Sequence, residues 1–192
     1  MSNKSKVAIV NRALALLGAN RITNLTDDTQ EAKIVNNMYE GSLKSILCEC
    51  CWNFATKRKM LNMITTKPAW GGGNMFQLPS DMVRIFDTSA DVEYTIEENY
   101  LITRASEIGI KYTYVNDDDS VYPPYFVDAF VYRLAHDICY DLTNSASRAN
   151  ELLDMYEGHY LPVAKSKNAR DKSPVKVKDG EWVNSVNHAR WD

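Results

Sequence analysis

The sequence has few of the residues on which metal sites and disulfide frameworks depend. Four of its 192 residues are cysteine and three are histidine, while glycine and proline contribute eight and six. Cys48, Cys50 and Cys51 crowd into four positions and Cys139 stands alone, a spacing that suits neither disulfide bridges nor a tetrahedral zinc site. We therefore expect reduced thiols made in a cytoplasm, with no metal and no cofactor.

Long apolar runs are also missing. No stretch approaches the roughly 18 to 20 apolar residues that a helix needs to cross a bilayer. The first residues, MSNKSKVAIVNR, lack an uninterrupted apolar segment and a small-residue cleavage site. We expect neither a membrane span nor a secretion signal.

Catalytic motifs are scarce. His136, His159 and His188 have no second histidine three or four positions away, as a zinc site on a helix would require. The glycines at 71–73 lack the Lys-Ser or Lys-Thr pair of a phosphate loop, and no GxSxG elbow occurs. The residues therefore give little support to zinc, phosphate-loop or nucleophilic-triad chemistry. A carboxylate pair for glycoside hydrolysis stays an alternative, drawn from Glu93, Glu97, Glu107 and Asp117.

Charge is distributed unevenly along the chain, although its net value is −3. Residues 1–80 carry a net +5, residues 81–160 a net −11, and residues 161–192 a net +3. Basic ends and an acidic middle could meet on neighbouring copies, or could be ordinary solvated surface. Asp117, Asp118 and Asp119 are the candidate acids for a joint between copies.

Apolar residues at steps of three and four predict four helices, over residues 4–17, 28–50, 124–142 and 145–161. Gly18 can end the first in a left-handed conformation, and Asp28 with Glu31 can cap the second. Ser145 can cap the fourth, which Pro162 should end. The third begins at a Pro-Pro pair, where proline costs least.

Strand signals are confined to residues 52–116. Alternating apolar and polar residues over 82–86, 92–96, 100–103 and 108–114 predict an antiparallel sheet of three to five strands, with Glu98-Asn99 as a hairpin turn. Residues 67–74 contain too much glycine and proline for a regular element, which predicts an exposed, mobile loop. The expected fold class is α+β: a bundle of about four helices, a small antiparallel sheet and an extended C-terminal arm.

We predict a core at residues 1–165 and an arm at residues 166–192. The arm is rich in lysine and poor in apolar periodicity, so a chain truncated after Lys165 is expected to fold. Its large apolar residues are typical of an interface, and Val175 to Val177 alternate as an added strand would. The candidate contacts in the arm are Lys176, Lys178, Trp182 and Val183.

Aromatic and basic residues interleave at 52–59 (WNFATKRK), which could stack on bases and bind phosphates. No recognised nucleic-acid-binding signature accompanies the segment. A nucleic-acid-binding module is therefore a lesser alternative to aromatic anchors under the sheet, with three basic residues exposed beside them.

Several segments, read in order, resemble the tail tubular protein A family of short-tailed, podovirus-type bacteriophages. They are IVNRALALLG at 9–18 with Ile22-Thr23, WNFA at 52–55, QLPSD at 77–81, YTYV at 112–115, PYFVDA at 124–129, Arg133-Leu134-Ala135 and Leu142-Thr143. The resemblance covers about residues 7–165.

The resemblance implies a structural virion protein without catalysis: a head-to-tail adaptor (connector) of the viral tail. It implies a ring of twelve copies between the portal protein and a tail nozzle protein similar to tail tubular protein B, through which DNA passes non-specifically during ejection. With such a channel, Asp117, Asp118 and Asp119 are also candidates for its lining, where repulsion would keep DNA from adhering. The resemblance leaves open whether tail fibres attach. The alternative, from the carboxylates above, is a tail-associated peptidoglycan hydrolase.

Overall fold

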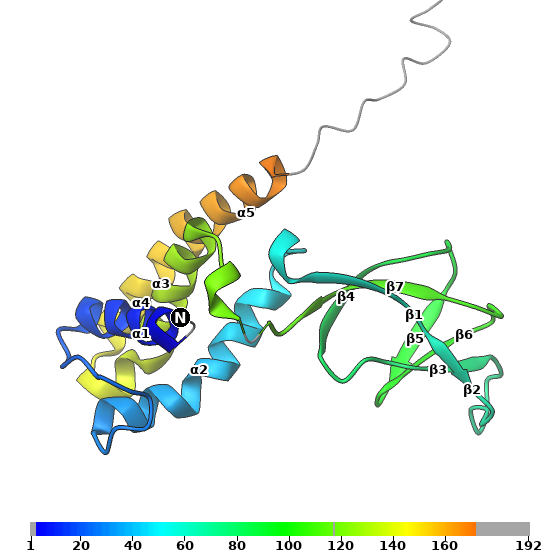
Figure 1. Ribbon diagram of the computed structural model, residues 1–192, viewed down its shortest axis with the longest axis horizontal. Helices are drawn as coiled ribbons and strands as arrows, with labels where there is room; N and C mark the ends of the chain where they lie inside the picture. The colour runs from blue at the N-terminus through cyan, green and yellow to red at the C-terminus, as the bar shows by residue number, and fades with distance from the viewer. Residues whose placement is uncertain (1–2, 117, 172–192) are drawn as a thin grey trace, which may run out of the picture.

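The computed structural model describes residues 3–116 and 118–171, with side chains from residue 6 onward. The molecule is elongated, with the helices at one end and the strands at the other (Figure 1). The α+β class predicted from the sequence is confirmed, with helices and two small antiparallel sheets. Residues 172–192, most of the predicted arm, lie outside the described residues.

The helical end holds the larger core. Its helices are α1 (Asn3–Leu17), α2 (Gln30–Cys48), α3 (Pro124–Thr143), α4 (Ala146–Met155) and α5 (Leu161–Arg170). α3 is the centre, since α1, α2, α4 and α5 all contact it. Val10, Leu14, Ile46, Phe130 and Leu134 are among the side chains buried there. Within the described residues, no helix is long and apolar enough to cross a membrane.

The ends of the first two helices test the predicted caps. Gly18 has φ +69°, the Ala19 N–H bonds to the Leu14 carbonyl, and the Gly18 N–H bonds to the Ala15 carbonyl, which is a Schellman ending. The cap predicted at Asp28 is wrong, because the Thr29 hydroxyl accepts the Ala32 N–H at 3.2 Å instead. Asp28 pairs with Lys33.

The predicted helix end at Pro162 is also wrong. A π-helical turn, η3 (Tyr156–Tyr160), connects α4 to α5, and the helical path continues to Arg170. The Leu161 N–H bonds back five residues to the Tyr156 carbonyl, so the hydrogen-bond spacing changes at the residue before Pro162. Pro162 has no backbone N–H, and it lies at the start of α5, where this donor is least needed. Residues 166–170 therefore belong to the folded part, and the boundary predicted at 165 is placed too early.

The strands form two sheets rather than the expected single one. One sheet has the order β1 (Thr56–Met60), β7 (Gly109–Tyr114), β4 (Met82–Thr88). The other has the order β2 (Asn62–Ile64), β3 (Asn74–Gln77), β6 (Tyr100–Thr103), β5 (Tyr94–Glu97), and every pairing is antiparallel. The expectation of three to five strands misses β1, β2 and β3, because Lys57 to Lys59 give β1 no apolar alternation and β2 is three residues long.

The two sheets share a second, smaller core. Phe76 of β3 and Leu101 of β6 are buried with Ile110 and Tyr112 of β7, so side chains from both sheets contribute. Leu61, between β1 and β2, is buried in the same cluster at the point where the chain passes from one sheet to the other.

Segment 52–55 joins the two ends of the molecule. Trp52 is fully buried, its indole N–H donates to the Ile46 carbonyl at 2.8 Å, and its ring meets Phe126 edge-on at 5.0 Å. Phe54 lies 4.6 Å from Phe126 between ring centroids. These aromatics are anchors beside the exposed basic residues of β1, as predicted, but they pack in the helical core rather than under the sheet.

Candidate interaction surfaces

The segments behind the family resemblance form joints within one chain. Asn11 closes the turn after α1 by exchanging two hydrogen bonds with the backbone of Ile22, each 2.9 Å long. Arg12 pairs with Asp128 of α3 at 2.7 Å, linking segment 9–18 to segment 124–129. These motifs therefore stabilise the packing of α1 on α3.

Asn53, from segment 52–55, fixes the last described helix. The backbone N–H of Asn53 donates to the side-chain oxygen of Asn168 at 2.9 Å, and the Asn53 amide donates to the Asn168 carbonyl at 2.7 Å. The Asn168 amide in turn donates to the Cys51 carbonyl at 3.0 Å. Asn168 is 1% exposed, so α5 is held to the start of the strand region by a buried polar contact.

Asp81, from segment 77–81, ties the loop before β4 to β1 and β7. Lys57 donates to the Asp81 carboxylate at 2.7 Å, and the Tyr112 hydroxyl donates to the same carboxylate at 3.3 Å. The Val115 N–H donates to the backbone carbonyl of Asp81. Burial raises the pKa of Asp81, but the Lys57 hydrogen bond and charge and the Tyr112 hydroxyl outweigh it and leave the pKa below 3.8.

Several ion pairs within the chain join segments of opposite net charge. Arg12 with Asp128, and Lys57 with Asp81, each join a base of residues 1–80 to an acid of residues 81–160. Lys165 of the basic last segment pairs with Glu49 at 3.0 Å. Part of the predicted complementarity between copies is therefore satisfied inside a single chain.

The three candidate aspartates differ in position and exposure. Asp117 lies outside the described residues. Asp118 is exposed and caps the short helix η2 (Asp119–Val121) by accepting from Ser120, whose hydroxyl and N–H lower the pKa of Asp118. Asp119, the third candidate for a channel lining or a subunit joint, is 3% exposed in the single chain and faces the interior near Tyr39. A triple-aspartate sequence cannot reveal which member turns inward.

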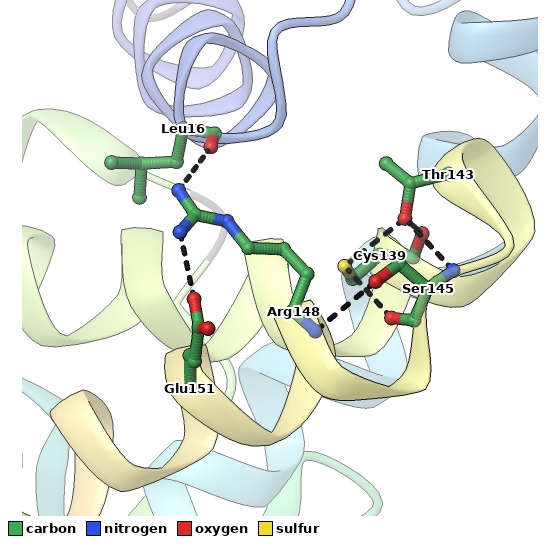
Figure 2. A network of polar contacts seen from close by, with 6 residues as sticks. All are labelled: Leu16, Cys139, Thr143, Ser145, Arg148 and Glu151. Carbon is green, nitrogen blue, oxygen red and sulfur yellow. Dashed lines mark hydrogen bonds and ion pairs between the residues drawn. The ribbon is translucent and has the colours of Figure 1, made fainter.

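Arg148 connects α4 to α1 in the helical bundle (Figure 2). Its guanidinium donates to the Leu16 carbonyl at 3.2 Å and pairs with Glu151 at 2.9 Å. The Arg148 N–H donates to the Ser145 hydroxyl, which confirms the predicted cap of α4. The Thr143 hydroxyl donates to the Cys139 carbonyl within α3 at 2.7 Å and accepts the Ser145 N–H at 3.3 Å, which links the end of α3 to the start of α4.

Titratable side chains inside the bundle have structural partners. Asp137 accepts from Ser42 of α2 at 2.6 Å and from Arg133 at 3.0 Å, joining α2 to α3. The Nδ1 atom of His136 lies 2.9 Å from the Ala149 carbonyl oxygen. The four cysteines are free thiols, and burial raises the pKa of Cys48. In the described ranges, no group of three or more His, Cys, Asp or Glu residues is placed to hold a metal ion.

Among the described residues, the most exposed large apolar side chain is in the loop between β2 and β3. Trp70 is 89% exposed, and Gly71, Gly72 and Gly73 follow it with φ of +84°, +72° and +112°. The loop borders a groove of about 840 Å³ that runs along β5 and β6. An exposed indole beside a groove is typical of a surface that binds another protein.

The predicted arm contacts Lys176, Lys178, Trp182 and Val183 lie outside the described residues. Sequence reasoning placed Trp70 in an exposed loop, as the structure does, but did not name it as a contact residue. It missed the exposure of β5, for which aromatic and β-branched residues give no signal. A search of protein-family models found no match to the chain, and a search of curated proteins found no relative.

Proposed function

We propose that the protein is a structural part of a phage virion, a head-to-tail adaptor that forms a ring between the portal and the tail nozzle. The observation that carries the proposal is the ordered series of segments resembling the tail tubular protein A family. The structure of those segments adds support, because Asn11, Arg12, Asn53, Asp81 and Asp128 each form a contact that fixes one element against another.

The shape of the subunit fits a ring component. The helical end and the strand end lie at opposite ends of an elongated molecule (Figure 1). Each end has exposed large apolar side chains: Trp70 and Met63 on the strand end, Tyr140 and Met155 on the helical end. A head-to-tail ring requires different contact surfaces on one subunit, and portal and nozzle require two more.

The carboxylates proposed for hydrolysis give less support to an enzyme. Glu93, Glu97 and Glu107 are exposed, and Asp117 lies outside the described residues. A glycosidase needs one acid in an apolar environment that keeps it protonated, whereas these three glutamates are in solvent.

Electron microscopy of the purified full chain, alone and mixed with portal particles, tests the proposal. We expect rings coaxial with the portal, either preformed or assembled on it. A chain that never joins portal particles would contradict the adaptor. Clearing of cell-wall material that depends on Glu93, Glu97 or Glu107 would support the hydrolase instead, and Thr66→Ala serves as the matched surface control.

A further inference from the structure

Strand β5 is an exposed edge of the four-stranded sheet. It pairs with β6 on one side, and no described strand lies on its other side. All four residues of β5 are exposed, including Tyr94 at 39% and Ile96 at 48%. An exposed edge with apolar side chains is a template for an added strand.

The other three edges carry features that discourage pairing. β1 presents Lys57, Arg58 and Lys59, and β2 is three residues long. The register of β4 against β7 shifts twice, between Met82 and Arg84 and between Ile85 and Asp87. Basic residues, short length and bulges are the devices that protect sheet edges, whereas β5 pairs without a shift and has no lysine or proline.

The hairpin geometry fixes which backbone groups β5 offers. Glu97 and Tyr100 close a two-residue turn, so this pair exchanges backbone hydrogen bonds. Bonding to β6 then alternates along the strand, and the N–H and C=O groups of Tyr94 and Ile96 point away from the sheet. An incoming strand would pair at these two residues.

The side chains of β5 divide into two faces. Tyr94 and Ile96 share one face, while Thr95 and Glu97 lie on the other, with Glu93 just before them. Glu93, Glu97 and Glu98 are exposed, and none forms an ion pair within residues 3–116 and 118–171. The edge therefore combines an apolar face with an acidic one.

We propose that β5 receives residues 174–178 (PVKVK) from a second copy of this chain as an added strand. Val175 and Val177 would lie against Tyr94 and Ile96, and Lys176 and Lys178 would lie on the acidic face. In a parallel arrangement Lys178 is opposite Glu97, and in an antiparallel one it is opposite Glu93. We choose this segment because its valines would face the apolar side of β5 and its lysines the acidic side, whether the added strand runs parallel or antiparallel.

A neighbouring copy is the better source of the strand than the same chain. Val175 follows Asp171 by four residues, which span at most about 14 Å. α5 ends in the helical half of the molecule, whereas the sheet that holds β5 is in the other half (Figure 1). This inference rests on the proposed function only in assuming that copies stand side by side.

Photo-crosslinking of the full chain tests the strand exchange. A nitrogen-15-labelled chain with Val177→benzoylphenylalanine is mixed with the unlabelled natural chain and irradiated, and cross-linked peptides are mapped by mass spectrometry. We expect heavy-to-light links to residues 93–98. Ile96→Lys in the unlabelled chain should lower their yield about tenfold, because it places a charge on the apolar face that would receive Val175 and Val177. Met63→Lys, on the other edge of the same sheet, is the matched control.

Links that map elsewhere, links within one copy, or equal loss with both lysine variants would overturn the inference. Circular dichroism of each variant verifies that it is folded. The outcomes separate the two proposals: rings on the portal without links to residues 93–98 refute the strand exchange alone. Such links in a chain that never joins the portal refute the adaptor alone.

Discussion

Asn53 and Asn168 form two hydrogen bonds with each other although 115 positions separate them in the sequence. One asparagine precedes the first strand and the other is in the last turn of α5. The contact closes the helical bundle over the junction with the sheets, and Tyr125 adds a bond from its hydroxyl to Asp171 at 2.7 Å. The end of α5 is therefore part of the folded core.

Replacement of Asn168 by alanine should lower the free energy of unfolding by about 2 to 4 kcal/mol. The Asn168 side chain is buried, and its loss leaves the Asn53 N–H and the Cys51 carbonyl without their partner. Urea denaturation of Asn168→Ala measures the effect against Lys167→Ala, whose side chain is exposed. Equal losses in the two variants would contradict the role of this contact.

Two truncations locate the end of the core. A chain ending at Asp171 should unfold within a few degrees of the parent, since it keeps α5 and both asparagine contacts. A chain ending at Lys165 should lose about 5 °C or more, contrary to the expectation from sequence, because it lacks Asn168. Scanning calorimetry compares the two, and matching transitions would show that residues 166–171 contribute nothing to stability.

Gly73→Ala should destabilise the protein by about 2 to 3 kcal/mol, and more than Gly72→Ala does. At φ +112° a side chain is strained, and an added Cβ would lie 3.2 Å from the Thr103 carbonyl oxygen. Gly72 has φ +72° with no atom near the added Cβ, which makes it the matched control. Chemical denaturation that ranks Gly72→Ala as the more harmful change would refute the close approach of this loop to β6.

The ion pair between Lys57 and Asp81 should contribute to stability down to weakly acidic pH. Because the folded-state pKa of Asp81 is below 3.8, the folded chain binds fewer protons than the unfolded chain as pH falls. The difference in unfolding free energy between the parent and Asp81→Asn should be about 0.5 kcal/mol and constant above about pH 5, then vanish as pH falls below about 4. Urea titrations at each pH measure it.

Glu107→Gln is the control for this titration, since Glu107 is exposed and forms no ion pair among the described residues. A difference for Asp81→Asn that persists unchanged at pH 3 would argue against a charged pair.

Trp70→Ala should leave the free energy of unfolding within about 0.5 kcal/mol of the parent, because the indole is 89% exposed. If the loop binds portal or nozzle, the variant should lose most of its co-sedimentation with those particles. Thr66→Ala, exposed in the same loop, should retain it. Full co-assembly of Trp70→Ala would exclude this loop from the adaptor contacts.

The sequence by itself determined where the first three helices lie, the class of the fold and several of the helix ends. Apolar spacing places α1, α2 and α3 to within two residues, and Gly18, Pro124 and Ser145 mark ends for local reasons of φ, missing N–H or side-chain capping. The strands β4 to β7 follow from alternation and from the Glu98-Asn99 turn. These features depend on neighbours within a few positions.

The tertiary structure alone decided which candidate residues are on the surface. Asp119 faces inward while Asp118 faces solvent, and the helix passes Pro162 because a π turn and the Asn53 contact support its continuation. Partners for Asn168, Asp81 and Asp128 come from residues 24 to 116 positions away, and pairing over such distances leaves no local pattern. The exposure of β5 likewise depends on which strands the fold leaves at the edges of its sheets.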